Sequence, residues 1–178
     1  MTISMIACVT SDMCIGLYGD LLISLKPDMK HFKEITDGHV VVMGRNTYES
    51  LKVKPLPGRT NIIISTTMNE MPPGFFVFKS VDNFLKFYKD YDGEVFIIGG
   101  AMIYDAFMPY ADKIYLTHVH RHGSTLLSNT HANYNTLVKF PNSLFDYDWD
   151  IQKTPDTMCL DRTFGIVHYN FLTLTKKV

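Results

Sequence analysis

The sequence predicts an α/β fold in which helices flank a central, mostly parallel sheet. Its 178 residues, 46% of them hydrophobic, are enough for one ordinary globular domain, so we expect one domain over residues 1–178. Short apolar runs alternate with stretches of helical period, and several runs are apolar almost throughout, as in strands covered on both faces. The last two strand candidates have no helix between them, which predicts an antiparallel pair at one edge of the sheet.

Each element follows from a local pattern. Apolar, β-rich runs predict strands at residues 3–9, 39–43, 60–65, 95–98, 113–119, 145–151 and 162–174. Helical periodicity predicts helices at residues 27–36, 45–51, 81–89 and 101–108. Pro27 suits a first helical turn, and Ser80 suits an N-cap. The polar segment 120–135 has no clear period, so we expect a loop there.

Composition excludes several classes of protein. With 17 Lys and Arg against 18 Asp and Glu, the chain has no broad basic field for nucleic acid, and its partner is expected to be a small molecule. The three cysteines include no C-x-x-C pair, so we expect no disulfide framework and a reducing cytoplasmic location. The apolar start is far shorter than the ~20 residues that span a membrane, and it predicts a buried first strand.

Asp28 is the first candidate for chemistry. In a helix beginning at Pro27 it lies on the same face as Phe32 and Ile35, so a carboxylate faces the apolar side. One interpretation is a solvated first-turn acid that complements the helix dipole. The other is a carboxyl in an apolar pocket, where desolvation raises its pKa and lets it relay a proton near neutral pH.

Three apolar strands run into a glycine or hydroxyl residue and then a helix start, at residues 43–47, 64–67 and 98–102. Carboxyl ends of strands in an open α/β sheet are where nucleotides bind, with helix N-termini facing phosphate. Gly99-Gly100 alone also fits a tight packing turn. Arg45 opposes the dipole of its own helix unless an anion is present, although it also fits an ordinary surface arginine.

Two further motifs are less specific. The proline-rich turn at residues 55–59 places Arg59 where the next strand begins. The planar guanidinium of Arg59 suits a ligand carboxylate, although an incidental surface arginine is the commoner interpretation. His118, His120 and His122 alternate along a strand end. We expect a solvated strand face there and no metal site, because the nearby sequence offers no acidic or thiol partner.

The order and spacing of these motifs resemble those of dihydrofolate reductases over nearly the whole chain. The matching positions are Ile6-Ala7, Ile15-Gly16, Pro27-Asp28 with Phe32, residues 43–50, residues 55–59, residues 97–100, Tyr104 and residues 115–117. The resemblance implies a single α/β domain around a mixed, mostly parallel eight-stranded sheet. It also implies a monomeric enzyme that reduces 7,8-dihydrofolate to 5,6,7,8-tetrahydrofolate with NADPH.

The same resemblance implies the roles of individual residues. Asp28 is then the catalytic acid, Thr117 supports it, and Arg59 holds the glutamate tail. Apolar contacts to the substrate are implied for Ile6, Ala7, Phe32, Leu51, Leu56, Ile98 and Tyr104. Contacts to NADPH are implied for Ala7, Cys8, Ile15, Gly44, Arg45, Asn46, Thr47, Ser65, Thr66, Lys79, Ile98, Gly99, Gly100, Ala101, Met102, Ile103 and Tyr104. Arg45 with the hydroxyls of Ser65 and Thr66 favours NADPH over NADH.

The chain also departs from the family pattern. Leu22-Ile23 replaces the usual Pro-Trp pair, which affects the expected proton path, and Met102 stands where some relatives have a second arginine, which predicts weaker phosphate discrimination. Residues 120–139 are longer and more irregular than in the family. The alternatives are a related pterin or pyrimidine reductase of the same fold, or a nucleotide-binding or structural protein that has lost turnover.

Overall fold

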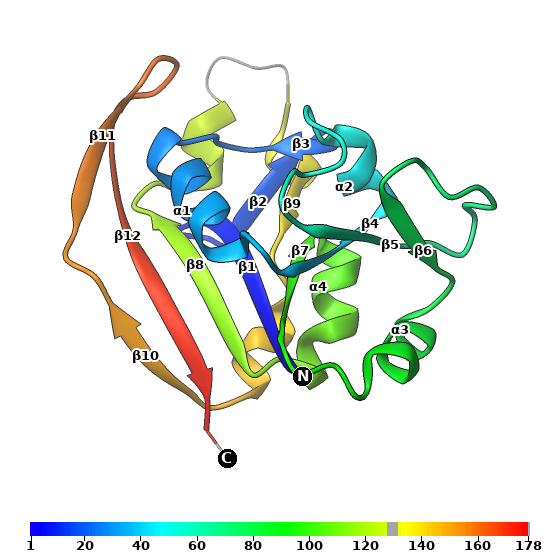
Figure 1. Ribbon diagram of the computed structural model, residues 1–178. Helices are drawn as coiled ribbons and strands as arrows, with labels where there is room; N and C mark the ends of the chain where they lie inside the picture. The colour runs from blue at the N-terminus through cyan, green and yellow to red at the C-terminus, as the bar shows by residue number, and fades with distance from the viewer. Residues whose placement is uncertain (128–131, 178) are drawn as a thin grey trace.

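A large twisted sheet forms the centre of the protein (Figure 1). The computed structural model describes residues 1–127 and 132–177. In spatial order the strands are β10 (Trp149–Lys153), β12 (Gly165–Lys176), β8 (Lys113–Val119), β1 (Thr2–Thr10), β7 (Glu94–Gly99), β4 (Val40–Gly44), β5 (Thr60–Ile64) and β6 (Phe75–Phe78). The short strand β11 (Thr157–Asp161) also pairs with β12, so β10 and β11 together fill one edge position.

The sheet is mixed and mostly parallel, as predicted. From β8 through β6 every neighbouring pair is parallel. β12 runs antiparallel to β8 and to both edge strands. The predicted antiparallel pair at one edge is therefore confirmed, and nine strand segments fill eight positions in the sheet.

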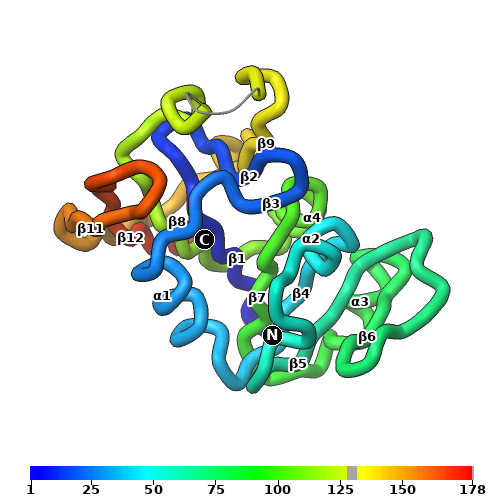
Figure 2. The backbone as a smooth tube through the Cα atoms, turned by 90° about the horizontal axis from the view of Figure 1, so that it is seen from above, coloured from blue at the N-terminus to red at the C-terminus, as the bar shows by residue number. Residues whose placement is uncertain are grey.

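Helices cover the two faces of the sheet. α3 (Val81–Tyr88) and α4 (Ala101–Phe107) contribute to a core with Met5 and Val42. α1 (Lys26–Thr36) and α2 (Arg45–Ser50) contribute to a core with Ile6 and Met43 on the opposite face. Figure 2 shows α1 and α4 on opposite sides of β1. The side chains of β1 alternate between these cores because successive residues of a strand point to opposite faces.

Most predicted elements lie within two residues of their observed bounds, and Ser80 caps α3 through a bond from the Asn83 N–H, as expected. The prediction misses the short strand β6 and the small sheet of β3 (Asp20–Leu21), β2 (Cys14–Leu17) and β9 (Leu137–Lys139). It also begins a strand at residue 145, inside the 3-10 turn η4 (Asn142–Asp146), whereas β10 begins at Trp149, and it misses β11. These segments are too short, or too dependent on a distant partner, to show a period of their own.

The predicted loop at residues 120–135 is partly structured. It contains the 3-10 turn η2 (Gly123–Leu127) and the start of η3 (Tyr134–Thr136), while residues 128–131 lie outside the described residues. Another 3-10 turn, η1 (Met108–Tyr110), follows α4. Within the described part of the chain, no helix combines the length and apolar character needed to cross a membrane.

Candidate active site

Asp28 and Thr117 meet beneath α1. Asp28 lies in the first turn of α1 and is only 8% exposed, which contradicts the solvated interpretation of this acid. The Thr117 hydroxyl on β8 donates to Asp28 Oδ1 at 2.6 Å. Burial raises the pKa of the Asp28 carboxyl above its ordinary value, and the Thr117 hydrogen bond offsets part of that rise. The arrangement gives one buried acid whose proton is retained closer to neutral pH than on an exposed aspartate.

Three neighbouring strands, β1, β8 and β12, each contribute one side chain to a row next to Asp28. Cys8 on β1, Thr117 on β8 and Phe171 on β12 are paired across the strands and therefore point to the same face of the sheet. His31, one turn after Asp28, stacks on Phe171 with ring centroids 4.0 Å apart. This packing fixes the start of α1 against the sheet, and with it the position of the carboxyl.

An apolar wall adjoins the acid. Ile6 is buried in the core cluster on the α1 side, and the same cluster receives partly buried side chains from four of the predicted substrate contacts, Phe32, Leu51, Leu56 and Ile98. These side chains come from α1, the end of α2, the proline-rich turn and β7. Because they remain partly exposed while packing together, they form an apolar surface that a flat ring can cover.

Arg59 lies at the end of this wall. Its side chain is only 4% exposed, and Cζ lies 5.9 Å from the Phe32 ring centroid. Nη1 donates to the Pro57 carbonyl at 2.6 Å and lies 3.6 Å from Asp37 Oδ1, while Nε is buried and has no hydrogen-bond partner among the described residues. A buried guanidinium with a free donor suits a ligand carboxylate.

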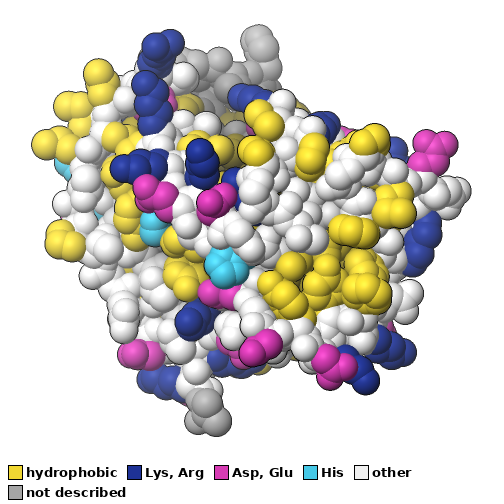
Figure 3. All heavy atoms as spheres, viewed as in Figure 1, with side chains coloured by type: hydrophobic (Ala, Val, Ile, Leu, Met, Phe, Trp, Pro, Cys, Tyr) yellow, Lys and Arg dark blue, Asp and Glu magenta, His cyan; other side chains and the backbone are white. Residues whose placement is uncertain are grey.

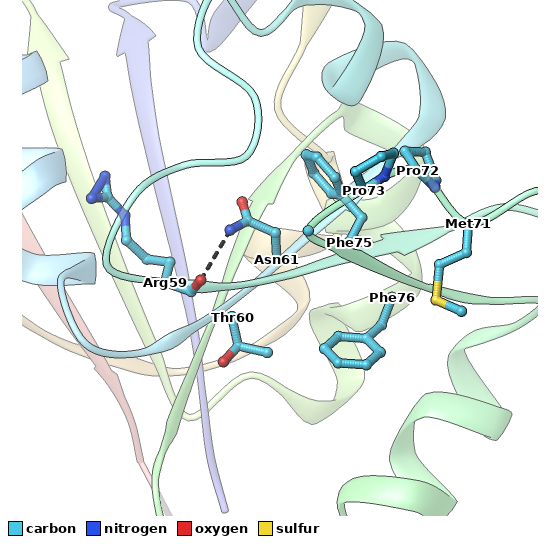
Figure 4. A pocket seen from close by; sticks show the side chains of 9 residues that line it. Arg59, Thr60, Asn61, Met71, Pro72, Pro73, Phe75 and Phe76 are labelled. Carbon is cyan, nitrogen blue, oxygen red and sulfur yellow. Dashed lines mark hydrogen bonds between the residues drawn. The ribbon is translucent and has the colours of Figure 1, made fainter.

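Asn61 holds the proline-rich turn at residues 55–59 through hydrogen bonds to its backbone. Its amide nitrogen donates to the carbonyls of Leu56 and Arg59, and its Oδ1 accepts from the Leu56 N–H. In Figure 4 the Arg59 side chain extends away from Met71 and Phe76, so only the backbone of Arg59 faces the hollow drawn there. The turn therefore directs the guanidinium to the α1 side of the sheet.

Two glycine turns meet at the carboxyl ends of β4 and β7. Gly44 precedes α2 and Gly100 precedes α4, and neither helix start has a side-chain cap. A Cβ on Gly44 would lie 2.8 Å from Ile103 Cγ1, and one on Gly100 would lie 3.4 Å from Thr47 Oγ1. The two helix starts are thus close together with their backbone N–H groups uncapped. A dinucleotide pyrophosphate fits this arrangement, since both donors and close backbone approach are present.

Tyr104 packs against the Gly99-Gly100 turn between β7 and α4. Its hydroxyl donates to the Ile6 carbonyl at 2.7 Å, and its ring would contact a Cβ on Gly99 at 3.3 Å. Gly99 has φ +119, a conformation that side-chain-bearing residues rarely adopt, and the Gly99-Gly100 peptide is cis. Burial raises the pKa of the Tyr104 hydroxyl, which keeps it a neutral donor. Tyr104 thereby links the β7–α4 turn to β1.

The cationic end of the predicted cofactor site is exposed. Arg45 Nε donates to Glu49 Oε1 at 2.6 Å, and Nη1 donates to Thr67 Oγ1 at 3.3 Å. Ser65 Oγ lies 3.3 Å from Thr67 Oγ1, so the hydroxyl that contacts Arg45 belongs to Thr67, whereas the sequence predicted Ser65 and Thr66. Lys79 donates to the Met68 carbonyl and to Asn69 Oδ1 in the same loop. These groups suit a phosphate monoester.

The remaining predicted contacts are distributed around this framework. Thr66 is exposed, and Met102 is 86% exposed, so neither side chain is held in place by packing. Ala101 and Asn46 lie in the first turns of α4 and α2. Ala7 and Ile15 join the α4-side core, on the face opposite Ile6 and Cys8.

Leu22 and Ile23 stand where the resemblance implies a Pro-Trp pair. They are 8% and 4% exposed and pack with Cys8 and Leu25 in one cluster. Burial raises the pKa of the Cys8 thiol well above its ordinary value, and the nearby Asp28 charge adds to this effect, so Cys8 acts as an apolar wall. The side chains of Leu22, Ile23 and Leu25 therefore offer no hydrogen-bonding group to this part of the site.

Two surface hollows, of about 470 and 460 Å³, adjoin this arrangement near Arg59. The first lies along the outer side of α1, and the second lies beside β5 and β6, where exposed hydrophobic side chains gather in Figure 3. His118 and His120 have ring centroids 5.2 Å apart, and Asp156 lies 3.9 Å from His120. The sequence did not reveal this acidic neighbour. Among the described residues, no group of three potential ligands could hold a metal ion.

Sequence reasoning missed several residues that shape the site. Asn61, Thr67 and Glu49 act through contacts formed only after the strands are aligned. Asn61 lies inside β5 and Thr67 follows soon after its end, so a polar residue within or just after an apolar strand was a usable signal. The stacking of His31 on Phe171 joins residues 140 positions apart and had no local signal.

The arrangement is that of an α/β enzyme for two ligands, with a buried acid in an apolar pocket beside phosphate-binding turns. A family model for dihydrofolate reductase matches residues 2–143. Dihydrofolate reductase of Buchnera aphidicola subsp. Acyrthosiphon pisum (strain APS) is 42% identical over 120 residues, 67% of this chain and 73% of that protein. That of Bacillus subtilis (strain 168) is 38% identical over 118 residues, 66% of this chain and 69% of that protein.

A solved dihydrofolate reductase from Enterococcus faecalis, complexed with NADP(H) and RAB-propyl, has the same fold. The TM-score is 0.79 at 24% identity, covering 99% of this chain and 97% of that one. The chain belongs to the dihydrofolate reductase family. The resemblance inferred from the motifs is confirmed, and the eight-position mixed sheet agrees with the fold it implied.

Proposed function

We propose that the protein, as one domain over residues 1–178, reduces 7,8-dihydrofolate to 5,6,7,8-tetrahydrofolate with NADPH, with Asp28 assisting protonation of the substrate ring. The reaction is that of the family to which the chain belongs. The observation that carries the assignment of the acid is the burial of Asp28, with Thr117 as its hydrogen-bond partner, beside an apolar wall.

Asp28 has two tasks in this proposal. Its carboxylate accepts hydrogen bonds from a polar edge of the pterin and so orients the ring against Phe32. Because burial raises its pKa, the carboxyl also retains a proton at a pH where an exposed aspartate is ionised, and water can carry that proton to the ring. Thr117 holds Oδ1, which leaves Oδ2 for the substrate.

The other groups position the two ligands. NADPH supplies the hydride when bound. The glycines at residues 44, 99 and 100 leave room for close backbone approach to its pyrophosphate, and Arg45 with the hydroxyls of Ser65 and Thr67 is suited to hold its extra phosphate. Arg59 is suited to hold the carboxylate of the glutamate tail, which fixes the far end of the substrate.

The test is the dihydrofolate-dependent loss of NADPH absorbance across a pH series, measured for the protein and for Asp28→Asn. We expect turnover that declines as pH rises through the raised pKa of Asp28, because the protonated form is then lost. Asp28→Asn should reduce turnover at pH 7 by ~100-fold or more while NADPH binding stays unchanged. An unchanged rate in the variant would remove the proton-relay role.

The alternatives predict other outcomes. A pyrimidine reductase would not consume NADPH with dihydrofolate, and a protein without turnover would bind both ligands and leave the absorbance constant. Binding can be measured independently, because a ligand that binds only the folded state raises the unfolding temperature. A monomeric state, a small-molecule substrate without nucleic-acid partners, and a cytoplasmic location are parts of the same proposal.

A further inference from the structure

Asp37 places a negative charge beside the arginine at the end of the apolar wall. It follows α1 directly, and its Oδ1 lies 3.6 Å from Arg59 Nη1. The two side chains differ in environment, since Asp37 is 61% exposed and Arg59 is 4% exposed. A solvated carboxylate therefore faces a buried guanidinium.

The stability of α1 does not explain an acid at this position. The carboxyl end of a helix carries the negative end of its dipole, so an aspartate there is electrostatically unfavourable. The backbone at Gly58 nevertheless leaves room for the Asp37 carboxylate. A Cβ on Gly58 would lie 2.6 Å from Asp37 Oδ1, and the Gly38 N–H donates to the Gly58 carbonyl at 2.8 Å. The lack of a side chain at Gly58 allows the carboxylate to lie next to Arg59.

Asp37 is not what orients the guanidinium. The Pro57 carbonyl accepts from Nη1 at 2.6 Å, whereas the Asp37 contact of 3.6 Å is longer than a hydrogen bond. Arg59 Nε lacks a partner within the described ranges and stays available to a ligand. Asp37 thus acts on this site through its charge.

The neighbouring surface is electrically balanced. The hollow of about 470 Å³ beside α1 is lined by two cations and two anions, namely Lys30, Lys33, Glu34 and Asp37. With the adjoining Arg59 the region carries three cations and two anions, and removing Asp37 would raise its net charge from +1 to +2. The balance therefore limits how strongly this end of the site attracts anions.

We propose that Asp37 is a specificity-determining residue that limits the affinity of the Arg59 end of the site for negatively charged substrate tails, and most strongly for tails with more than one glutamate. The inference rests on the proposed function, because it takes Arg59 as the group that receives the tail. Repulsion between Asp37 and a tail carboxylate is long-ranged and grows with the charge of the tail.

The experiment compares Asp37→Asn with the unaltered protein on three substrates. They are 7,8-dihydrofolate, its diglutamate form, and 6-methyl-7,8-dihydropterin, which has no carboxylate. We expect KM to fall by about threefold for dihydrofolate and further for the diglutamate, with no change for the methylpterin and unchanged kcat throughout. The difference should shrink in 0.5 M salt, where the Debye length is only a few ångströms.

Asp90→Asn is the matched control, because Asp90 is an 88% exposed acid paired with Lys89 outside this region. It should leave all three KM values unchanged. Asp37→Ser provides a second uncharged variant should the asparagine variant unfold. An unchanged or raised KM for dihydrofolate in a folded variant, or an equal change for the methylpterin, overturns the inference. Failure of the unaltered protein to reduce dihydrofolate would instead overturn the proposed function.

Discussion

The substrate end and the phosphate end of the site use similar charged residues in opposite environments. At the substrate end, Asp28 is 8% exposed and the Arg59 side chain 4% exposed. At the phosphate end, the side chains of Arg45 and Glu49 are 50% and 52% exposed and pair with each other. Charge interactions are weakened by water and salt at the second end and much less so at the first.

This difference in exposure indicates that the two ends of the site have different functions. Buried groups held by Thr117, Pro57 and Asn61 have little freedom, which suits a reaction that depends on the position of a ring and a proton. Exposed groups can rearrange around a phosphate, which suits a cofactor that must bind and leave in every cycle. Mutations of equal chemistry should therefore have unequal effects at the two ends.

Arg59→Ala should have the largest effect on binding. Loss of a buried, charge-assisted contact to a carboxylate costs about 2–3 kcal/mol, which corresponds to a rise of about 30- to 150-fold in KM for dihydrofolate. NADPH affinity should not change. Steady-state kinetics measure both, with the exposed Arg162→Ala as control. An unaltered KM would remove the tail-binding assignment of Arg59.

Arg45→Gln should have a smaller effect, because the guanidinium is half exposed. We expect the Kd for NADPH to rise by about tenfold and the Kd for NADH to stay nearly constant, since only NADPH carries the extra phosphate. Titration at 0.05 and 0.5 M salt should show that the difference shrinks with salt. Equal losses for both cofactors would show that Arg45 does not recognise that phosphate.

Much of the fold was predictable because its long elements carry their own periodicity. β8 was predicted at its observed bounds, and β1 and α1 within one residue at each end. β2 and β9 were not predictable, since each is defined by pairing with the other across more than 100 residues. The division of one edge into β10 and β11 likewise depends on the long partner β12.

The site was predictable where a single residue breaks a local rule. Asp28 places a charge on an apolar helix face, and Arg45 places a cation at a helix start, so both stand out in the amino-acid sequence alone. Asn61 and Asp37 carry only weak local signals, a polar residue inside an apolar strand and an acid at the carboxyl end of a helix. Their importance comes from a partner brought close by folding, respectively the proline-rich turn and Arg59.

Thr117→Val should show how far the Thr117 hydrogen bond sets the pKa of Asp28. The substitution preserves shape but removes the donor to Asp28 Oδ1, so the pKa of Asp28 should rise further and the decline of kcat should move to higher pH. Stability should fall by ~1 kcal/mol because a buried hydrogen bond is lost. Thr125→Val, at a more exposed threonine on η2, serves as the control for the pH profile. If kcat of the variant declines at the same pH as that of the unaltered protein, Thr117 does not set the pKa of Asp28.

Glu49→Gln should have the smallest effect, and in the opposite direction. Glu49 competes with a cofactor phosphate for Arg45 Nε, which it contacts at 2.6 Å. Exposed i,i+4 pairs are worth only about 0.3–0.5 kcal/mol, so releasing the guanidinium should tighten NADPH binding by about twofold and leave NADH binding unchanged. Weaker NADPH binding would instead mean that Glu49 orients Arg45, and that the exposed end of the site is more rigid than its solvent exposure indicates.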